Sequence, residues 1–413
     1  GGVLARTAWE QACVTLLANT RYLEDDCRIR LFAHVKTSGQ LLLGHQSHLS
    51  QEESKELLDE FMNGAAVGGI LAGMQADADT LSAAFLLPCI RAGVLDEEGV
   101  GREAGPVVQS LVEDVQWLGS LKDKFYAVDD DSARIVREYM MSAARDHRAV
   151  LVRLASSLHG LRQARGGGTP LYEQHLVALE SLQVYSPLAH ALGLGKVLWE
   201  FEDESFRALF PESYSSIEDW QASLWHESEA MMEQAKDSAL RSLNDNAFLK
   251  DHAVRFSISS RKKSAFSTFK KMFRSHKRRE QVLDVFAMRV VIGLKAEHRA
   301  NQTVQVQSCL EAYGAVRETL SNWEEPRGRF KDYVTKPKAN GYQSIHTTLE
   351  HPSGLPLEIQ LRTEDMHVIA EFGGASHDLY KGGIQSASAV KRFAELIRKD
   401  NTEALALPPG DTM

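Results

Sequence analysis

Apolar residues recur at three- and four-residue spacing from about residue 8 to residue 165, which predicts amphipathic helices. In the stretch 147–164 one helical face carries the apolar residues Leu151, Leu154, Ala155, Leu158 and Leu161. The sequence GGGTP at 166–170 then interrupts the pattern and predicts a domain boundary. We therefore expect an all-helical N-terminal domain over residues 1–168.

Residues 171–250 return to a helical pattern, so we expect a helical linker region over residues 169–250. This region is rich in aromatic side chains: Trp199, Phe201, Phe206 and Phe210. Because large aromatic rings stabilise packed interfaces, these four residues are expected to pack between the domains that the linker joins.

From about residue 252 the hydrophobic period changes. The sequence LDVFAMRVVI at 283–292 ends in three β-branched residues and predicts a buried strand, whereas 304–322 predicts an amphipathic helix. We expect a third, mixed-sheet domain over residues 251–400 and a tail over residues 401–413. The expected fold class of the whole chain is therefore α+β.

Two strands of this third domain have a polar face of unusual composition. Residues 344–349 and 357–363 alternate between apolar and polar positions, with a turn predicted at 351–354. The polar positions are Ser344, His346 and Thr348 in the first strand and Glu358, Gln360 and Arg362 in the second. Such a face normally meets solvent, but these side chains follow a basic loop, so we expect them to line a pocket. Cross-strand charge pairing without function is the alternative.

The basic loop occupies residues 329–348, RFKDYVTKPKANGYQSIHTT. The loop contains four cations: Arg329, Lys331, Lys336 and Lys338. They precede an Asn340-Gly341 pair, which predicts a tight turn into the following strand. Closely spaced cations require an anion, and Tyr342 offers a planar face. The loop therefore predicts a phosphorylated, aromatic ligand such as a nucleotide. A solvated basic loop with a core tyrosine is the simpler interpretation.

A second basic stretch, 264–279, is predicted to be helical and carries Lys270, Lys271, Arg274, Lys277, Arg278 and Arg279. Such a run could be a nucleic-acid patch, an import signal or a solvated face. Lys263, Ser267 and Lys271 are spaced four apart and are expected to share one helical face. That arrangement suits a polyphosphate lying along a helix.

Composition limits the classes of protein to consider. The 413-residue chain is 43% hydrophobic and 25% charged, as globular proteins are, and its net charge of -9 argues against a general nucleic-acid binder. No apolar run approaches the roughly 20 residues of a membrane span. The four cysteines are far apart and form no CxxC pair, which favours a reducing compartment. We expect a soluble protein that does not bind membranes.

The segment 329–348, continued by EIQLRTEDMHVIAEFGGASHDLYK at 358–381, resembles the synthetase signature of the RelA/SpoT family. These enzymes make guanosine tetra- or pentaphosphate. The resemblance spans roughly fifty residues, which is specific for a sequence motif. It implies a nucleotidyltransferase-like domain that transfers pyrophosphate from ATP to the ribose 3'-hydroxyl of GDP or GTP, releases AMP and uses Mg²⁺.

The resemblance also assigns roles to residues. It implies that ATP is bound by Arg261, Lys263, Ser267, Lys271 and Arg289. It implies that GDP or GTP is bound by Lys331, Lys338, Asn340, Tyr342, Ser344, His346, Gln360 and Arg362, with Tyr342 stacked on guanine. The implied catalytic residues are Glu358, Asp284 and His346. Asp284 and Glu358 would hold Mg²⁺, and whether Glu358 is base, metal ligand or both stays open.

The N-terminal part is similar to the family's helical hydrolase domain, which removes the 3'-pyrophosphate with a manganese ion. The framework persists at 70–87 and 153–162, but the ligand positions read Asn63-Gly64, Leu87-Pro88, Arg91-Ala92 and Ser156. Leu, Pro, Ala and Arg cannot bind a divalent cation. The resemblance therefore implies a degenerate HD-type domain without hydrolase activity. His159, on a helical face without an evident partner, is expected to be structural.

The basic form of 329–332, RFKD, is typical of family members that also hydrolyse. Its combination with an altered hydrolase site resembles a calcium-activated plastid branch of plants, which implies the chloroplast stroma, with the cytoplasm as alternative. No EF-hand pattern occurs in this sequence. Two other functions stay open: a catalytically silent guanine-nucleotide-binding regulatory protein, and an RNA-binding module that uses 261–279. A homo-oligomer or a regulatory partner also stays open.

Overall fold

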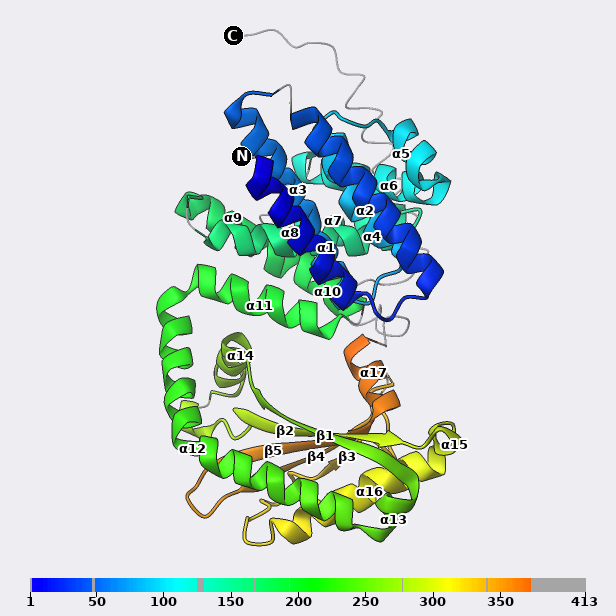
Figure 1. Ribbon diagram of the computed structural model, residues 1–413. Helices are drawn as coiled ribbons and strands as arrows, with labels where there is room; N and C mark the ends of the chain where they lie inside the picture. Colours follow the sequence, from blue (N-terminus) through cyan, green and yellow to red (C-terminus); the bar gives the residue numbers. More distant parts are fainter. Residues whose placement is uncertain are drawn as a thin grey trace. The chain divides into compact units, whose positions relative to one another are not determined.

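The computed structural model describes residues 2–46, 49–124, 130–166, 168–192, 194–276, 278–338 and 341–372 (Figure 1). The chain forms two compact units, one reaching Leu188 and the other beginning at Ala189. The first unit thus continues past the glycine-rich break at 166–170. No helix within the described ranges is long and apolar enough to cross a membrane.

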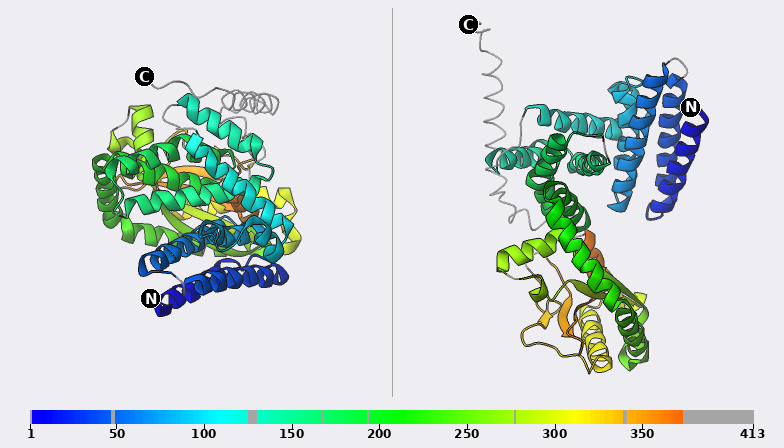
Figure 2. Two further views of the ribbon diagram at one scale, coloured as in Figure 1. Left: turned by 90° about the horizontal axis from the view of Figure 1, so that it is seen from above. Right: turned by 90° about the vertical axis from the view of Figure 1, so that its left-hand side faces the viewer.

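The first unit is helical, as expected, and Figure 2 shows its helices from two further directions. Its elements are α1 (Gly2–Asn19), α2 (Asp25–Gln46), α3 (Gln51–Gly73), α4 (Ala78–Arg91), α5 (Glu97–Ala104), α6 (Pro106–Lys124), α7 (Asp130–Ala143), α8 (His147–Arg165), α9 (Leu171–Glu180) and the π-helix η1 (Ser181–Tyr185). The helix predicted at 147–164 is confirmed as α8.

Two glycines let α3 approach α4 closely. A Cβ atom on Gly64 would lie 2.6 Å from Pro88 Cγ, and one on Gly68 would lie 2.5 Å from a ring carbon of Phe85. Real Cβ atoms do not make such contacts, so only glycine allows this crossing. The starts of α4 and α8 are joined as well, because Arg148 contacts its own cap residue Asp146 at 2.6 Å and Asp77, the cap of α4, at 2.8 Å.

The second unit contains the mixed sheet, so the α+β fold class is confirmed. Its helices are α11 (Gly195–Leu209), α12 (Pro211–Asp245), α13 (Ala247–His252), α14 (Ala265–Ser275), α15 (Ala296–Arg299), α16 (Gln302–Thr319), α17 (Glu364–Phe372) and the short η2 (Arg279–Gln281); α10 (Ser186–Ala191) spans the division between the units. Its strands are β1 (Ala253–Lys262), β2 (Phe286–Leu294), β3 (Lys331–Asp332), β4 (Ile345–Glu350) and β5 (Pro356–Thr363).

The strands lie in the order β1-β2-β5-β4-β3, and only β2 and β5 run parallel. One face of the sheet is apolar and is covered by α12 and α16, which Figure 1 shows below the sheet, with α14 and α17 above it. Met232 and Leu243 of α12 and Val316 of α16 pack there with Val290 and Ile359. The opposite face is therefore left for polar side chains.

One local expectation was wrong, and another is not tested by the structure. The helix predicted over 264–279 ends at Ser275, because His276 takes the left-handed conformation (φ 48°) that ends the helix. The aromatic residues expected to pack between the domains belong to the second unit. Phe206 packs with Phe266 and Phe269 of α14, whereas Phe210 is 54% exposed.

The position of the sheet core gives a stability prediction. Val290 is fully buried in β2, whereas Val254 in β1 is 64% exposed. Val290→Ala removes two buried carbons and leaves a cavity, so we expect a loss of about 2 kcal/mol in the free energy of unfolding. Val254→Ala is the matched control and should change it by less than about 0.5 kcal/mol. Urea denaturation followed by tryptophan fluorescence measures both, and equal effects would contradict the described burial.

Candidate active site

A row of polar residues crosses all five strands on the face opposite α12 and α16. Residues paired in register across neighbouring strands point to the same face of a sheet. The pairing connects Ser259, Arg289, Gln360, His346 and Lys331 in that order. A second row, on the same face, connects Arg261, Ala287, Glu358 and Thr348. The register thus gathers residues from five separate segments of sequence.

Glu358 lies in the middle of this face and is held by two neighbours. His346 Nδ1 lies 3.2 Å from one carboxylate oxygen, and the Gln360 amide donates to the other at 2.9 Å. Burial opposes ionisation of Glu358, but the hydrogen bond and charge of His346 and the Gln360 amide outweigh it, so its pKa lies below the usual range. The carboxylate is therefore ionised at neutral pH and can accept a proton.

His346 connects Glu358 to Tyr342. The phenolic oxygen of Tyr342 lies 2.8 Å from His346 Nε2, on the opposite side of the ring from Glu358. An ionised carboxylate only accepts hydrogen bonds, so His346 Nδ1 carries a proton and donates to Glu358. Burial raises the pKa of Tyr342, which keeps its hydroxyl protonated. The three residues form one chain of hydrogen bonds.

Asp284 precedes β2 and binds two lysines. Its carboxylate oxygens lie 3.1 Å from Lys263 Nζ and 2.7 Å from Lys271 Nζ. Burial opposes ionisation, but the two ammonium groups outweigh it and hold the pKa of Asp284 below its usual range. Lys271 belongs to α14, whereas Lys263 precedes the helix cap Ser264, so the expectation that both share one helical face was wrong. They meet at Asp284 nevertheless.

The other residues expected to bind ATP are placed as follows. The guanidinium carbon of Arg261 lies 3.6 Å from the ring centre of Trp199 on α11, a cation–π contact that the sequence did not indicate. Ser267 lies in the first turn of α14, where its amide nitrogen bonds the cap Ser264 at 3.2 Å. Arg289 lies in the polar row between Ser259 and Gln360.

The basic loop contacts two aromatic rings. Lys338 Nζ lies 4.6 Å from the ring centre of Tyr333 and 4.9 Å from that of Tyr342. Gly341 has φ +76°, which favours glycine, and donates its amide to the Lys338 carbonyl at 2.9 Å. Asn340 lies outside the described residues. Lys331 is exposed in β3, opposite His346.

Two residues expected to bind the guanine nucleotide are buried in the sheet. Ser344 donates to the Leu361 carbonyl at 3.1 Å and has no exposed surface. Arg362 is 2% exposed and its Nη2 lies 2.7 Å from His367 Nδ1, which gives His367 of α17 a partner that the sequence left undefined. Both residues make internal contacts in this structure.

The two carboxylates fit a magnesium ion by their chemistry. Asp284 lies three positions before Ala287, the register partner of Glu358, and its charge acts on the pKa of Glu358. Among the residues that the structure describes, no group of three or more His, Cys, Asp or Glu side chains could hold a metal. Two carboxylates completed by substrate phosphates are typical of Mg²⁺ sites, so Asp284 and Glu358 could hold the ion.

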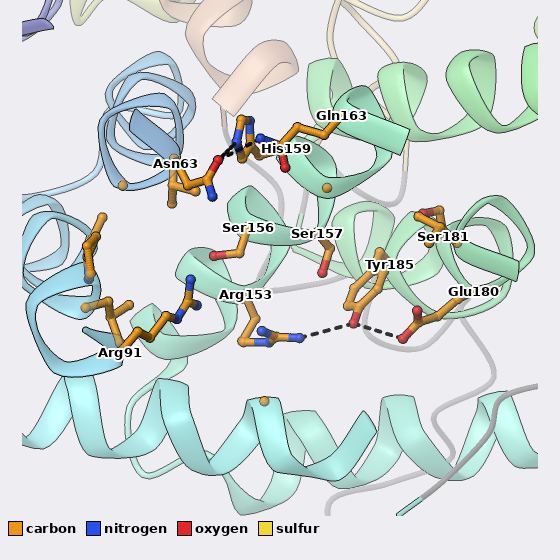
Figure 3. Close-up of a pocket in the computed structure, with 18 residues that line it drawn as sticks. Asn63, Arg91, Arg153, Ser156, Ser157, His159, Gln163, Glu180, Ser181 and Tyr185 are labelled. Carbon is orange, nitrogen blue, oxygen red and sulfur yellow. Dashed lines mark hydrogen bonds between the residues drawn. The ribbon is translucent and has the colours of Figure 1, made fainter. Parts of the chain in front are cut away.

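The altered positions of the helical domain meet elsewhere, in the first unit. Asn63, Gly64, Leu87, Pro88, Arg91 and Ser156 all line one pocket (Figure 3). His159, expected to have no partner, lies in the same pocket with Nε2 2.9 Å from Asn63 Oδ1, so that expectation was wrong. Gln163 donates to the same oxygen at 2.7 Å.

The ion pairs of Asp284 predict a pH-dependent stability. A lowered folded-state pKa contributes stability at pH above the unfolded value of about 3.9, and that contribution disappears as the pH falls through the folded value. Asp284→Asn should therefore lower the free energy of unfolding at pH 7, and the loss should shrink between pH 4 and pH 3. Urea denaturation over this range tests it. Asp237→Asn, exposed on α12, is the control; a pH-independent loss in the Asp284 variant would contradict the assignment.

Comparison with known proteins identifies both parts of the chain. A family described as the region found in RelA / SpoT proteins matches residues 260–385, and an HD domain family matches residues 43–195. Two solved structures are similar. The small alarmone synthetase 2 of Bacillus subtilis is 23% identical, and the match covers 46% of this chain and 97% of that chain with a TM-score of 0.29. The small alarmone synthetase 1 of Bacillus subtilis is 18% identical, and the match covers 48% of this chain and 97% of that chain with a TM-score of 0.24.

Curated relatives extend over most of the chain. The "GTP diphosphokinase CRSH1, chloroplastic" of Oryza sativa subsp. japonica is 36% identical over 80% of this chain and 56% of its own length. The "Probable GTP diphosphokinase CRSH, chloroplastic" of Arabidopsis thaliana is 34% identical over 79% of this chain and 56% of its own length. The "GTP pyrophosphokinase" of Escherichia coli K12 is 33% identical over 78% of this chain and 41% of its own length. The chain thus spans about half the length of these relatives and belongs to the RelA/SpoT family.

Proposed function

We propose that this chain is a (p)ppGpp synthetase that transfers pyrophosphate from ATP to the 3'-hydroxyl of GDP or GTP and releases AMP. The observation that carries the proposal is the Glu358 carboxylate, held ionised by His346 and Gln360 beside Asp284. The plant relatives named as GTP diphosphokinases support the same activity. Their names also support a chloroplast location, which we include in the proposal.

The proposed reaction needs a base at the acceptor hydroxyl. Glu358 takes the proton from the 3'-hydroxyl while the oxygen forms a bond to the β-phosphorus of ATP. The bond from that phosphorus to the oxygen bridging to the α-phosphate breaks, and AMP leaves with the oxygen. His346 orients Glu358 through Nδ1, and its own ring is fixed by Tyr342. General base catalysis of this kind contributes roughly 100- to 10,000-fold.

The proposed reaction also requires that the cations on the polar face of the sheet hold two polyanionic substrates together. In the proposed complex Lys263 and Lys271 exchange the Asp284 carboxylate for ATP phosphates, and Arg289 contributes from the polar row. Arg261, supported by Trp199, presents a flat guanidinium to the adenine. A bound Mg²⁺ would offset the remaining phosphate charge from Asp284 and Glu358. Lys338 and Tyr342 would receive the guanine nucleotide.

The same ion pairs weaken the alternative of an RNA-binding module. Lys262, Lys263, Lys270 and Lys271 each pair with a carboxylate of this unit: Glu218, Asp284, Glu202 and Asp284. The basic run is thus partly neutralised by its neighbours, whereas nucleic-acid binding requires cations available for phosphates.

Synthesis is tested by incubating the protein with ATP, Mg²⁺ and either GDP or GTP, followed by anion-exchange separation. We expect a more highly charged guanine nucleotide together with an equal amount of AMP. Glu358→Gln should lower the rate by about 100-fold or more, because the amide cannot take the proton. Glu297→Gln is the matched control, since Glu297 is 71% exposed on α15. Normal turnover in Glu358→Gln would refute the assigned base.

One other outcome of this assay also decides between functions. Nucleotide binding without any product would favour the silent guanine-nucleotide-binding protein. Circular dichroism and urea unfolding of Glu358→Gln, compared with those of the parent chain, show whether the variant keeps the native fold.

We further propose that the first unit does not hydrolyse the product. The support is chemical: the pocket that contains the altered ligand positions is lined by a single carboxylate, Glu180, a single imidazole, His159, and two arginines, Arg91 and Arg153. A divalent cation prefers carboxylate oxygens and imidazole, and positive guanidinium groups repel it.

This proposal predicts that purified (p)ppGpp stays intact when it is incubated with the protein and Mn²⁺. The measurement is pyrophosphate release, followed by the same anion-exchange separation. Released pyrophosphate that depends on Mn²⁺ and disappears in an Arg153→Gln variant would show that the pocket is a working hydrolase site.

A further inference from the structure

The pocket of the first unit has the size and the lining of a ligand site. It has a volume of about 330 Å³ and is lined by residues of α3, α4, α6, α8, α9 and η1 (Figure 3). One part of the wall is apolar: Val67, Ala84, Leu87 and Pro88. The remaining wall carries hydroxyl, amide and guanidinium groups. Small-molecule pockets combine an apolar wall with a few converging polar groups in this way, and their volumes begin at about 300 Å³.

The charge of the lining is positive. Arg91 and Arg153 contribute two permanent cations, because a guanidinium keeps its proton at any physiological pH. The single carboxylate, Glu180, accepts a hydrogen bond from Tyr185 at 3.2 Å. Burial, together with the charge of Arg162, lowers the pKa of His159, which keeps that ring neutral. A pocket with two cations and one anion selects for negative ligands, although the whole chain is acidic.

Arg153 has hydrogen-bonding capacity that the protein does not use. Its Nη2 reaches Tyr185 Oη only at 3.5 Å, and its Nε is buried without a hydrogen-bond partner within the described part of the chain. Arg153 lines the pocket, and a ligand with two oxygens on one phosphorus can accept from the two terminal nitrogens of the guanidinium, which a single carbonyl cannot do.

Arg91 can turn toward the same ligand. Its Nη1 pairs with Glu60 at 3.3 Å, and both side chains are more than one-third exposed. Exposed pairs of this kind contribute little, so Arg91 can exchange Glu60 for a ligand oxygen. Figure 3 shows Arg91, Ser156, Ser157 and Arg153 around the open middle of the pocket.

We propose that this pocket binds a small phosphorylated ligand without a metal ion and without cleaving it. The phosphate or diphosphate group lies between Arg91 and Arg153, and the organic part lies against Val67, Leu87 and Pro88. Arg91 occupies a position that the family resemblance assigns to an acidic residue of the metal site, so the positive charge that a metal would supply comes from the protein. The pocket therefore acts as a binding site for a phosphate ester.

The test is calorimetric titration of the whole chain with inorganic pyrophosphate and with ADP, each in EDTA. Both probes can also bind the synthetase site, so the variants identify the pocket. We expect one binding event to weaken at least tenfold in Arg153→Gln and in Arg91→Gln, and to be partly restored in Arg153→Lys. Arg165→Gln, at the exposed end of α8, should leave every event unchanged.

Ser157→Asp provides a second variant that does not remove a packed arginine. Its new carboxylate should repel the phosphate and abolish the same binding event, while urea unfolding stays as in the parent chain. The proposal is overturned if Arg153→Gln and Ser157→Asp bind both probes as the parent chain does, or if the event requires a divalent cation. Because the readout is binding in EDTA, it does not depend on whether the second unit makes (p)ppGpp.

Discussion

The parallel pairing of β2 with β5 is the constraint on which the second unit depends. These strands are distant in sequence, and a parallel pair requires a long connection, supplied here by α15, α16 and the strands that follow. The pairing places Val290 and Ile359 in the core beneath α12 and α16. The same register places Arg289 beside Gln360, and the Asp284 end of β2 beside Glu358, on the opposite face. One set of main-chain hydrogen bonds thus positions both the core and the site.

Residue alternation was enough to predict much of this arrangement. The apolar and polar positions of 344–349 and 357–363 identified β4 and β5 and grouped His346, Glu358 and Gln360 on one face. Alternation describes only a single strand, however. The partner of each strand depends on contacts distant in sequence, so the five-strand row from Ser259 to Lys331 became visible only with the register.

The contacts of single side chains were less predictable. Lys263 and Lys271 were expected to face a ligand, and in the structure both bind Asp284, because a buried carboxylate attracts any ammonium group within reach. Ser344 follows the alternation, but it is buried in the sheet and bonds a main-chain carbonyl. Trp199 lies far from the synthetase motifs in sequence, so no local pattern could associate it with Arg261. In the first unit, the altered positions were grouped only by the family resemblance, and the pocket that six of them line depends on the helix crossing at Gly64 and Pro88.

The ion pairs of Lys263 and Lys271 with Asp284 affect the order in which a divalent cation and a nucleotide can bind at this site. A bare divalent cation that approaches Asp284 meets two ammonium groups already in place, and free nucleotide meets the negative charge of Asp284 and Glu358. A nucleotide that carries its own cation satisfies both sets of charges at once, since the lysines transfer to phosphate oxygens as the carboxylate is released. Binding of metal and of nucleotide is then thermodynamically linked, and each must raise the affinity for the other by the same factor. The resting ion pairs would keep the site closed to either component alone.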